Sequence, residues 1–185
     1  IMDIQLYAAQ AGSGFPLILL HGNGEEHSYF QHQMDFFQAQ YHVYALDTRG
    51  HGLSPRGTAP FTIRQFADDL HDWMVAAGLE KAHILGFSDG GNIALCFAIK
   101  YPQMVEKLIV NGANLDPSGV KPSVQRGIEV GYRLALRFGG NSPKGRLKAE
   151  ILGLMVNEPN LTPTDLGCIS CPTLVLAGTN DMILE

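Results

Sequence analysis

A serine flanked by glycines is the strongest indication of chemistry in this sequence. It lies in the run GFSDGG (residues 86–91), between an apolar stretch typical of a strand and a stretch typical of a helix. A serine on so tight a turn has a strained backbone, so the neighbouring positions need residues without a Cβ atom. The helix that follows offers unpaired N–H groups and a partial positive charge at its N-terminus. The run therefore predicts a nucleophile elbow with Ser88 as the nucleophile and Gly86 and Gly90 as the elbow glycines.

A second glycine-bearing turn, HGNG (residues 21–24), follows the apolar run 16–20. Because parallel strands end at the same edge of a sheet, this turn is expected to lie beside the serine. Main-chain N–H groups aimed at one point there would form an oxyanion hole for an acyl-transfer reaction. We expect the N–H groups of Asn23 and Asp89 to be its two donors. The alternative is that the glycines of the turn simply connect a strand to a helix.

Short apolar runs alternate with helical patterns, and these elements must position the two turns. Strands are predicted at 4–8, 16–20, 43–46, 82–87, 105–111 and 173–177, and helices at 28–39, 63–77 and 90–101. This alternation indicates an α/β fold built on a doubly wound, mostly parallel sheet with flanking helices. Prolines and glycines break the rhythm over residues 113–167, which predicts a small helical cap insertion. Residues 1–112 and 168–185 would then form the core.

Four motifs, each at the end of a predicted strand, together resemble the α/β-hydrolase fold family in its serine esterase and lipase-like branch. In chain order they are LLHGNG (19–24), DTRGHGLS (47–54), GFSDGG (86–91) and LAGTND (176–181). The resemblance implies a catalytic triad of serine, acid and histidine in that order. Asp181 then fits the acid that would orient the histidine, and Asp116, which follows the preceding strand, is the alternative. Arg49 and His51 are expected to organise their own loop through hydrogen bonds.

The histidine that the resemblance implies is not found after Asp181. All seven histidines precede Ser88, at positions 21, 27, 32, 42, 51, 71 and 83. Without a base, a serine hydroxyl is a poor nucleophile at neutral pH. We therefore expect the triad histidine to lie outside these 185 residues, together with a further strand and helix of the core. The strand at 173–177 favours this, because it is apolar on both faces and would otherwise leave an unpaired edge.

These observations predict a serine hydrolase that cleaves an ester or related acyl bond of a small molecule through an acyl-enzyme on Ser88. Thioesterases, lactonases and carbon–carbon bond hydrolases of the family are not separated from esterases by this sequence. A serine nucleophile argues against dehalogenases and epoxide hydrolases, which resemble this family but use a carboxylate. The alternative from another class is a non-catalytic binding or scaffold protein that has the pocket and lacks the histidine.

The composition is that of an ordinary globular protein, with 45% hydrophobic and 17% charged residues. A net charge of -5 without long runs of one sign predicts no nucleic-acid partner and no basic membrane-binding face. The three cysteines suit a reducing compartment, and no apolar run is long enough for a membrane span, so a cytoplasmic location is expected. No cofactor is expected.

A metal site is not expected either. Cys168 and Cys171 have C-x-x-C spacing but lack a matching pair, so we interpret them as half-buried thiols. A second grouping of side chains that could be metal ligands matches no recognised site; its members are His21, Glu25, Glu26 and His27.

Overall fold

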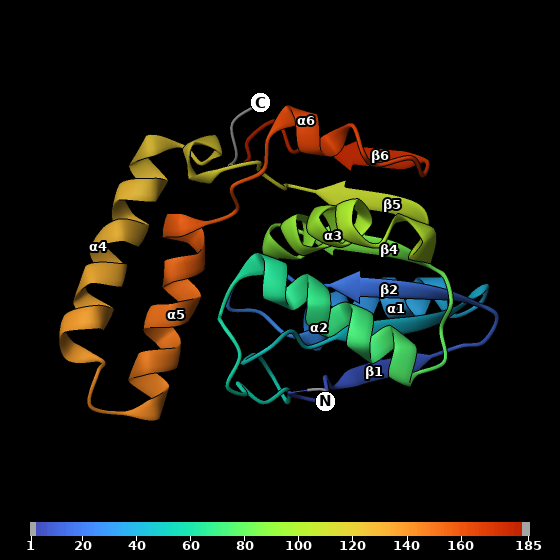
Figure 1. The fold of residues 1–185 in the computed structure, drawn as a ribbon, viewed down its shortest axis with the longest axis horizontal. Helices are drawn as coiled ribbons and strands as arrows, with labels where there is room; N and C mark the ends of the chain where they lie inside the picture. Colours follow the sequence, from blue (N-terminus) through green and yellow to red (C-terminus); the bar gives the residue numbers. More distant parts are fainter. Residues whose placement is uncertain (1–2, 183–185) are drawn as a thin grey trace.

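A computed structural model describes residues 3–182 of the chain. Six strands form a single sheet in the order β1-β3-β2-β4-β5-β6 (Figure 1). The strands are β1 (Ala8–Ala11), β2 (Phe15–Leu20), β3 (Tyr41–Leu46), β4 (Ala82–Phe87), β5 (Val105–Asn111) and β6 (Thr173–Leu176). The helices are α1 (Gln31–Phe37), α2 (Ile63–Ala76), α3 (Asp89–Lys100), α4 (Pro122–Phe138), α5 (Pro143–Asn157) and α6 (Pro163–Leu166). Short 3₁₀ turns cover His27–Phe30, Pro102–Met104 and Pro117–Gly119.

The sheet is parallel except for β1, which pairs antiparallel with β3. Successive residues of β2 point to opposite faces, as the period of two in a strand requires. Ile18 and Leu20 belong to the core that includes α2 and α3, whereas Leu17 and Leu19 belong to the core that includes α1. Both faces of β2 are thus covered, which explains its uninterrupted apolar sequence. The predicted α/β architecture with a mostly parallel sheet is confirmed.

The first strand lies further along the chain than the sequence predicts. The prediction of residues 4–8 is wrong: the ladder with β3 runs from Ala8, opposite Leu46, to Ala11. The backbone of Tyr7 is used elsewhere, because its N–H donates to Ser54 Oγ over 2.8 Å and its carbonyl accepts from the N–H of Asp47 over 3.0 Å. The apolar residues before Tyr7 are buried in the core without joining the ladder.

Helix α2 begins at Ile63, as the sequence predicts, and Thr62 is its N-cap. Thr62 Oγ1 accepts from the N–H of Gln65 over 3.1 Å. The side chain of Gln65 donates to Asp69 Oδ1 over 3.1 Å, one turn further along the helix. Gly78, with a φ of 69°, lies just after the end of this helix, a conformation that glycine adopts without steric cost.

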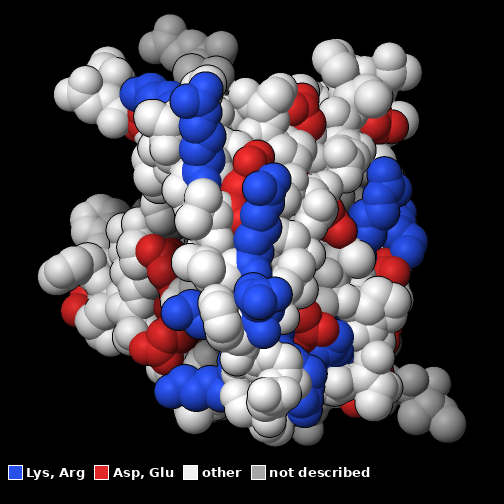
Figure 2. Space-filling model, turned by 90° about the vertical axis from the view of Figure 1, so that its left-hand side faces the viewer, with Lys and Arg blue, Asp and Glu red and all other residues white. Residues whose placement is uncertain are grey.

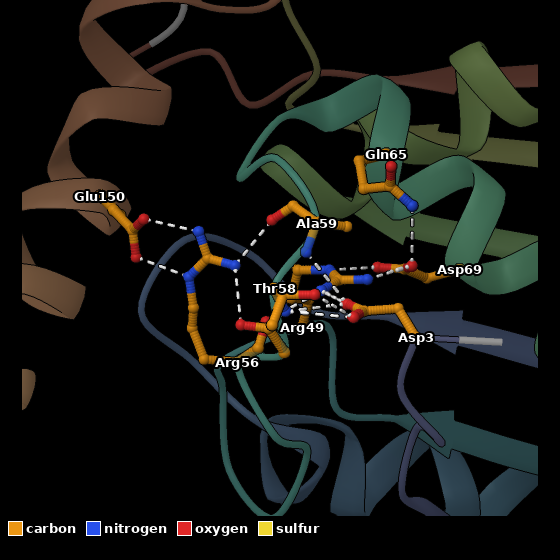
Figure 3. Close-up of polar contacts among 9 residues, drawn as sticks. Asp3, Arg49, Arg56, Thr58, Ala59, Gln65, Asp69 and Glu150 are labelled. Atoms are coloured by element: carbon orange, nitrogen blue, oxygen red, sulfur yellow. Dashed lines mark hydrogen bonds and ion pairs between the residues drawn. The ribbon is translucent and has the colours of Figure 1, made fainter.

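Arg49 organises the loop after β3, as expected. Its guanidinium is fully buried and donates twice to Asp69, from Nε over 2.7 Å and from Nη2 over 2.6 Å (Figure 3). Nη1 donates to Asp3 Oδ2 over 2.5 Å and to the carbonyl of Arg56 over 2.9 Å. The loop, helix α2 and the N-terminal segment are therefore held by one side chain.

Helices α4 and α5 form an antiparallel hairpin that projects beyond the carboxyl edge of the sheet (Figure 1). Arg56 holds the hairpin to the core through a two-pronged ion pair with Glu150, at 2.6 and 2.9 Å (Figure 3). Such a geometry matches the planar guanidinium to a carboxylate. In residues 3–182, no helix has both the length and the apolar character needed to cross a lipid bilayer.

Candidate active site

Ser88 lies on the turn between the last residue of β4 and the first residue of α3. Its φ of 53° and ψ of -120° make it the one non-glycine residue with a positive φ in residues 3–182. The turn is held on both sides: the N–H of Ser88 donates to the carbonyl of Asn111 over 2.8 Å, and its carbonyl accepts from the N–H of Gly91 over 2.8 Å. A strained conformation persists only where such contacts impose it.

The two glycines of the elbow have no space for a side chain. A Cβ atom on Gly86 would lie 2.2 Å from the carbonyl oxygen of Gly90. A Cβ atom on Gly90 would lie 2.0 Å from the carbonyl oxygen of Leu20, at the end of the neighbouring strand β2. The glycines at 86 and 90 are therefore required by close backbone approach.

The turn after β2 packs directly against the serine. A Cβ atom on Gly22 would lie 3.2 Å from Ser88 Cβ. Two of the N–H groups in this turn already have partners, because Gly22 donates to Glu25 Oε2 over 2.9 Å and Gly24 donates to His51 Nε2 over 3.2 Å. Within residues 3–182, no hydrogen bond uses the main-chain N–H of Asn23 or that of Asp89. Both are therefore available to a ligand beside the serine.

A side-chain hydrogen bond joins these same two residues. Asn23 Nδ2 donates to Asp89 Oδ2 over 2.8 Å, and it also donates to the carbonyl of Ile151 on helix α5 over 2.8 Å. Asn92 Nδ2 donates to the other carboxylate oxygen, Oδ1, over 3.3 Å. Burial raises the pKa of Asp89 above its ordinary value. This pair was not predicted from the sequence, although two polar side chains in glycine-rich turns were a visible signal.

Asp181 and Ser88 line the same small cavity, of about 40 Å³, at the carboxyl edge of the sheet. The Asp181 carboxylate lies against Gly112, where an added Cβ atom would be 3.3 Å from Asp181 Oδ2. Asp116, the alternative acid, does not line this cavity. Its carboxylate accepts from the N–H and the hydroxyl of Ser118, over 2.8 and 2.5 Å. The geometry therefore favours Asp181 over Asp116 as the partner of a base near Ser88.

The two histidines beneath this site are buried and structural. His21 Nδ1 donates to the carbonyl of Gly22 over 2.8 Å, and Nε2 accepts from the N–H of Thr48 over 3.0 Å. Burial lowers the pKa of His21 to about 4 and also lowers the pKa of His51. Both imidazoles are thus neutral near pH 7 and support the turn after β2. Among the residues that the structure describes, no hydrogen bond joins a histidine to Ser88.

The acidic and histidine side chains near the start of the chain gather differently from the grouping that the sequence suggests. Glu26, His27 and Asp47 place one ligand atom each within 4.8 Å of one another. The Asp47 carboxylate accepts from the N–H groups of His27 and Leu53, over 2.6 and 2.8 Å. These bonds give Asp47 a structural role in the loop after β3.

Of the two cysteines with C-x-x-C spacing, Cys171 is half-buried and Cys168 is exposed. The prediction that both thiols are half-buried is wrong for Cys168, because the turn after α6 leaves it at the surface.

A larger cavity of about 480 Å³ lies between the core and the α4–α5 hairpin. Glu158 lines both this cavity and the smaller one beside Ser88. Burial raises the pKa of Glu158, whose carboxylate accepts from the N–H of Ile63 over 2.6 Å. The apolar residues of the larger cavity include Phe61, Tyr132, Ala135, Leu136 and Leu154.

The sequence profile of the alpha/beta hydrolase fold matches residues 16–129. An uncharacterised protein of Mycobacterium tuberculosis is 30% identical over 125 residues, which make up 68% of this chain and 34% of the relative. Mouse epoxide hydrolase 3 is 35% identical over 121 residues, which make up 64% of this chain and 32% of that protein. The chain thus spans about a third of the length of these relatives.

Solved structures share the fold over nearly all of this chain. A thermophilic esterase from Thermogutta terrifontis, solved with malate bound, superposes with a TM-score of 0.77 at 26% identity. The match covers 97% of this chain and 77% of the esterase.

Proposed function

The chain belongs to the alpha/beta hydrolase fold family, and we propose that it is a serine hydrolase that cleaves an ester or related acyl bond of a small molecule. One observation carries the proposal: Ser88 is held at a positive φ beside two main-chain N–H groups, those of Asn23 and Asp89, that no described hydrogen bond uses. Donors fixed in advance near a developing oxyanion are the largest single source of rate in acyl transfer.

The chemistry follows from these positions. Ser88 Oγ bonds to the carbonyl carbon of the substrate and gives its proton to a histidine, while the carbonyl π electrons move to the oxygen. The N–H groups of Asn23 and Asp89 bind that oxyanion. When the carbonyl re-forms, the bond to the leaving alcohol breaks and the histidine returns the proton to it. Water then repeats the sequence on the acyl-enzyme and releases the acid.

We place the histidine outside the 185 residues, with Asp181 as the acid that orients it. Two observations support this: every histidine of the sequence precedes Ser88, and the buried His21 and His51 use their ring nitrogens to hold loops. Asp181 lines the cavity that Ser88 also lines, which supports it as the acid of the same site.

The choice of reaction rests on the nucleophile. A serine attacks carbonyl carbon and forms an acyl-enzyme, whereas ring opening of an epoxide in this family uses a carboxylate at the elbow. The structural likeness to an esterase at 26% identity supports the acyl substrate. The likeness to mouse epoxide hydrolase 3 supports hydrolysis in general and carries no argument for an epoxide substrate.

We assign the non-reacting part of the substrate to the 480 Å³ cavity, with residues 113–167 as the cap that shapes it. The cavity has the size of small-molecule sites in general, and its lining combines apolar side chains with the carboxylate of Glu158. The ion pair of Arg56 with Glu150 would fix the position of the cap over this cavity.

A panel of p-nitrophenyl esters with acyl chains of increasing length tests the proposal on the full natural protein. We expect hydrolysis that depends on chain length and is lost in Ser88→Ala, with unchanged thermal unfolding of the variant. Binding of the esters without turnover would contradict the proposal and favour the non-catalytic binding protein. Turnover that persists in Ser88→Ala would contradict the assignment of the nucleophile.

A further inference from the structure

Cationic side chains are concentrated on the α4–α5 hairpin. Residues 121–150 contain seven Lys and Arg against two Glu, a net charge of +5, whereas the whole chain carries -5. The remaining residues therefore carry a net charge of -10. Figure 2 shows the face of the molecule on which the hairpin projects, with a band of blue cationic side chains running down its middle. The net charge of the whole chain conceals this separation, and the expectation that the chain has no basic membrane-binding face rested on that net charge.

Large apolar side chains are exposed on helix α4 of this hairpin. Val130 is 56% exposed, Leu134 is 52% exposed and Phe138 is 71% exposed. Their spacing of four residues places them in one row along α4, because side chains four positions apart are neighbours on a helix. The same exposed surface of α4 carries three arginines in alternation with the apolar row: Arg126, Arg133 and Arg137.

These three guanidinium groups are not engaged in the fold. In residues 3–182, neither a hydrogen bond nor an ion pair holds any of them; the contact that the structure gives is a stacking of Arg137 over the ring of Phe138, at 5.7 Å. Arg56 differs, because both of its outer nitrogen atoms are bonded within the protein. The arginines of α4 are thus available to a partner.

A groove of about 410 Å³ runs along this face between the two helices. Its apolar lining comes from Leu134 and Phe138 of α4 and Leu152 of α5. Lys148 of α5 also lines it. The groove thus combines an apolar floor with a cation. Two of its apolar side chains, Leu134 and Phe138, belong to the apolar row of α4.

We propose that this face of the α4–α5 hairpin, with Val130, Leu134 and Phe138 in its apolar row, docks on an anionic lipid surface. Basic residues attract anionic headgroups, and apolar side chains on the same face enter the boundary between headgroups and acyl chains. A nucleic acid would satisfy the arginines and leave the aliphatic row in water. A lipid surface satisfies both.

The test is flotation of the protein with phosphatidylcholine vesicles that contain phosphatidylglycerol, compared with vesicles of phosphatidylcholine alone. We expect binding to the anionic vesicles that weakens as salt is added, because screening reduces the attraction. Arg126→Gln, Arg133→Gln and Arg137→Gln are combined in one variant. At about 1 kcal/mol, or roughly fivefold, for each cation near the surface, the triple variant should bind on the order of a hundredfold more weakly.

A matched control removes three cations from the opposite part of the molecule. Lys81→Gln, Lys100→Gln and Lys107→Gln change the net charge by the same amount, and none of these residues lies on the hairpin. This control should bind like the unsubstituted protein. A second triple variant, Val130→Ser with Leu134→Ser and Phe138→Ser, keeps the charge and should bind about tenfold or more weakly, because it loses the apolar contact.

Insertion is measured separately with Phe138→Trp, which adds one indole to the single Trp73. Its emission should move to shorter wavelength with the anionic vesicles and stay unchanged with phosphatidylcholine. The proposal is overturned if the protein does not float with anionic vesicles, or if the arginine and lysine variants lose binding equally. It is also overturned if the apolar variant binds as before while a single-stranded oligonucleotide competes for the site. None of these outcomes depends on Ser88.

Discussion

The side-chain amide of Asn23 donates to the carboxylate of Asp89 across 2.8 Å, although the two residues are 66 positions apart in the sequence. Asn23 lies in the turn after β2, and Asp89 is the first residue of α3. We assign the main-chain N–H groups of these same two residues to the oxyanion hole. The bond therefore fixes the distance between the two halves of the hole, and a second bond from the same amide to Ile151 connects it to helix α5.

Exchanging the two side chains tests this role. Asn23→Asp alone places two carboxylates face to face, and Asp89→Ala leaves the amide of Asn23 with the carbonyl of Ile151 as its acceptor but without the link to α3. Each should lower kcat by about tenfold or more with little change in KM, because misplaced oxyanion donors weaken binding of the transition state alone. Asn23→Asp combined with Asp89→Asn restores a donor and an acceptor between the two positions, although not the bond to Ile151, and should recover part of the lost kcat. A double variant that is slower than both single variants would contradict this role.

Two glycine-to-alanine substitutions, one at the elbow and one in helix α4, should change the free energy of unfolding in opposite directions. Gly90→Ala should lower the free energy of unfolding by about 3 kcal/mol, because the new Cβ atom would overlap the carbonyl oxygen of Leu20. In Gly127→Ala, inside helix α4, the new Cβ atom would have no atom within 4 Å. This substitution should raise the free energy of unfolding by about 0.5–1 kcal/mol. Urea denaturation of both variants measures the difference, and equal stability of the two would refute the close approach at position 90.

Removing the guanidinium of Arg49 should be strongly destabilising. Arg49→Met leaves the buried carboxylate of Asp69 without its cation, which lowers the free energy of unfolding by about 3–5 kcal/mol in comparable sites. Arg49→Lys should rescue little, since an ammonium cannot donate in parallel to both carboxylate oxygens. Lys81→Met, which breaks an exposed ion pair with Glu106, is the control and should have a much smaller effect. A full rescue by lysine would argue against the two-pronged geometry.

Stability should fall in mildly acidic solution because of His21. Its pKa is about 4 in the folded protein against 6.5 in the unfolded chain. Between these values the unfolded chain binds a proton that the folded protein does not, so the free energy of unfolding decreases as the pH falls, by roughly 3 kcal/mol in all. Thermal unfolding of the protein and of His21→Gln across this range measures the effect. The variant should show a flatter dependence, and an identical slope would contradict the assignment.

Local patterns in the sequence predicted the elements that carry the site. The bounds of β5 agree with its apolar run, and the glycines at 86 and 90 predicted the turn at Ser88, because each of these features depends on near neighbours. The bond of Asn23 to Asp89 could not be predicted, since its partners meet through the sheet. The same holds for the pair of Arg56 with Glu150, which are 94 residues apart. The charge of the hairpin was accessible in the sequence but required counting by segment.

Labelling with a fluorophosphonate, followed by mass spectrometry of the digested protein, tests whether Ser88 is the nucleophile. In the full natural protein, Ser88 Oγ should bond to phosphorus with loss of fluoride, and the adduct oxygen should occupy the oxyanion hole. We expect one modified peptide, that containing Ser88, and none in Ser88→Ala. An unmodified Ser88 at saturating reagent, or equal labelling of the alanine variant, would contradict it.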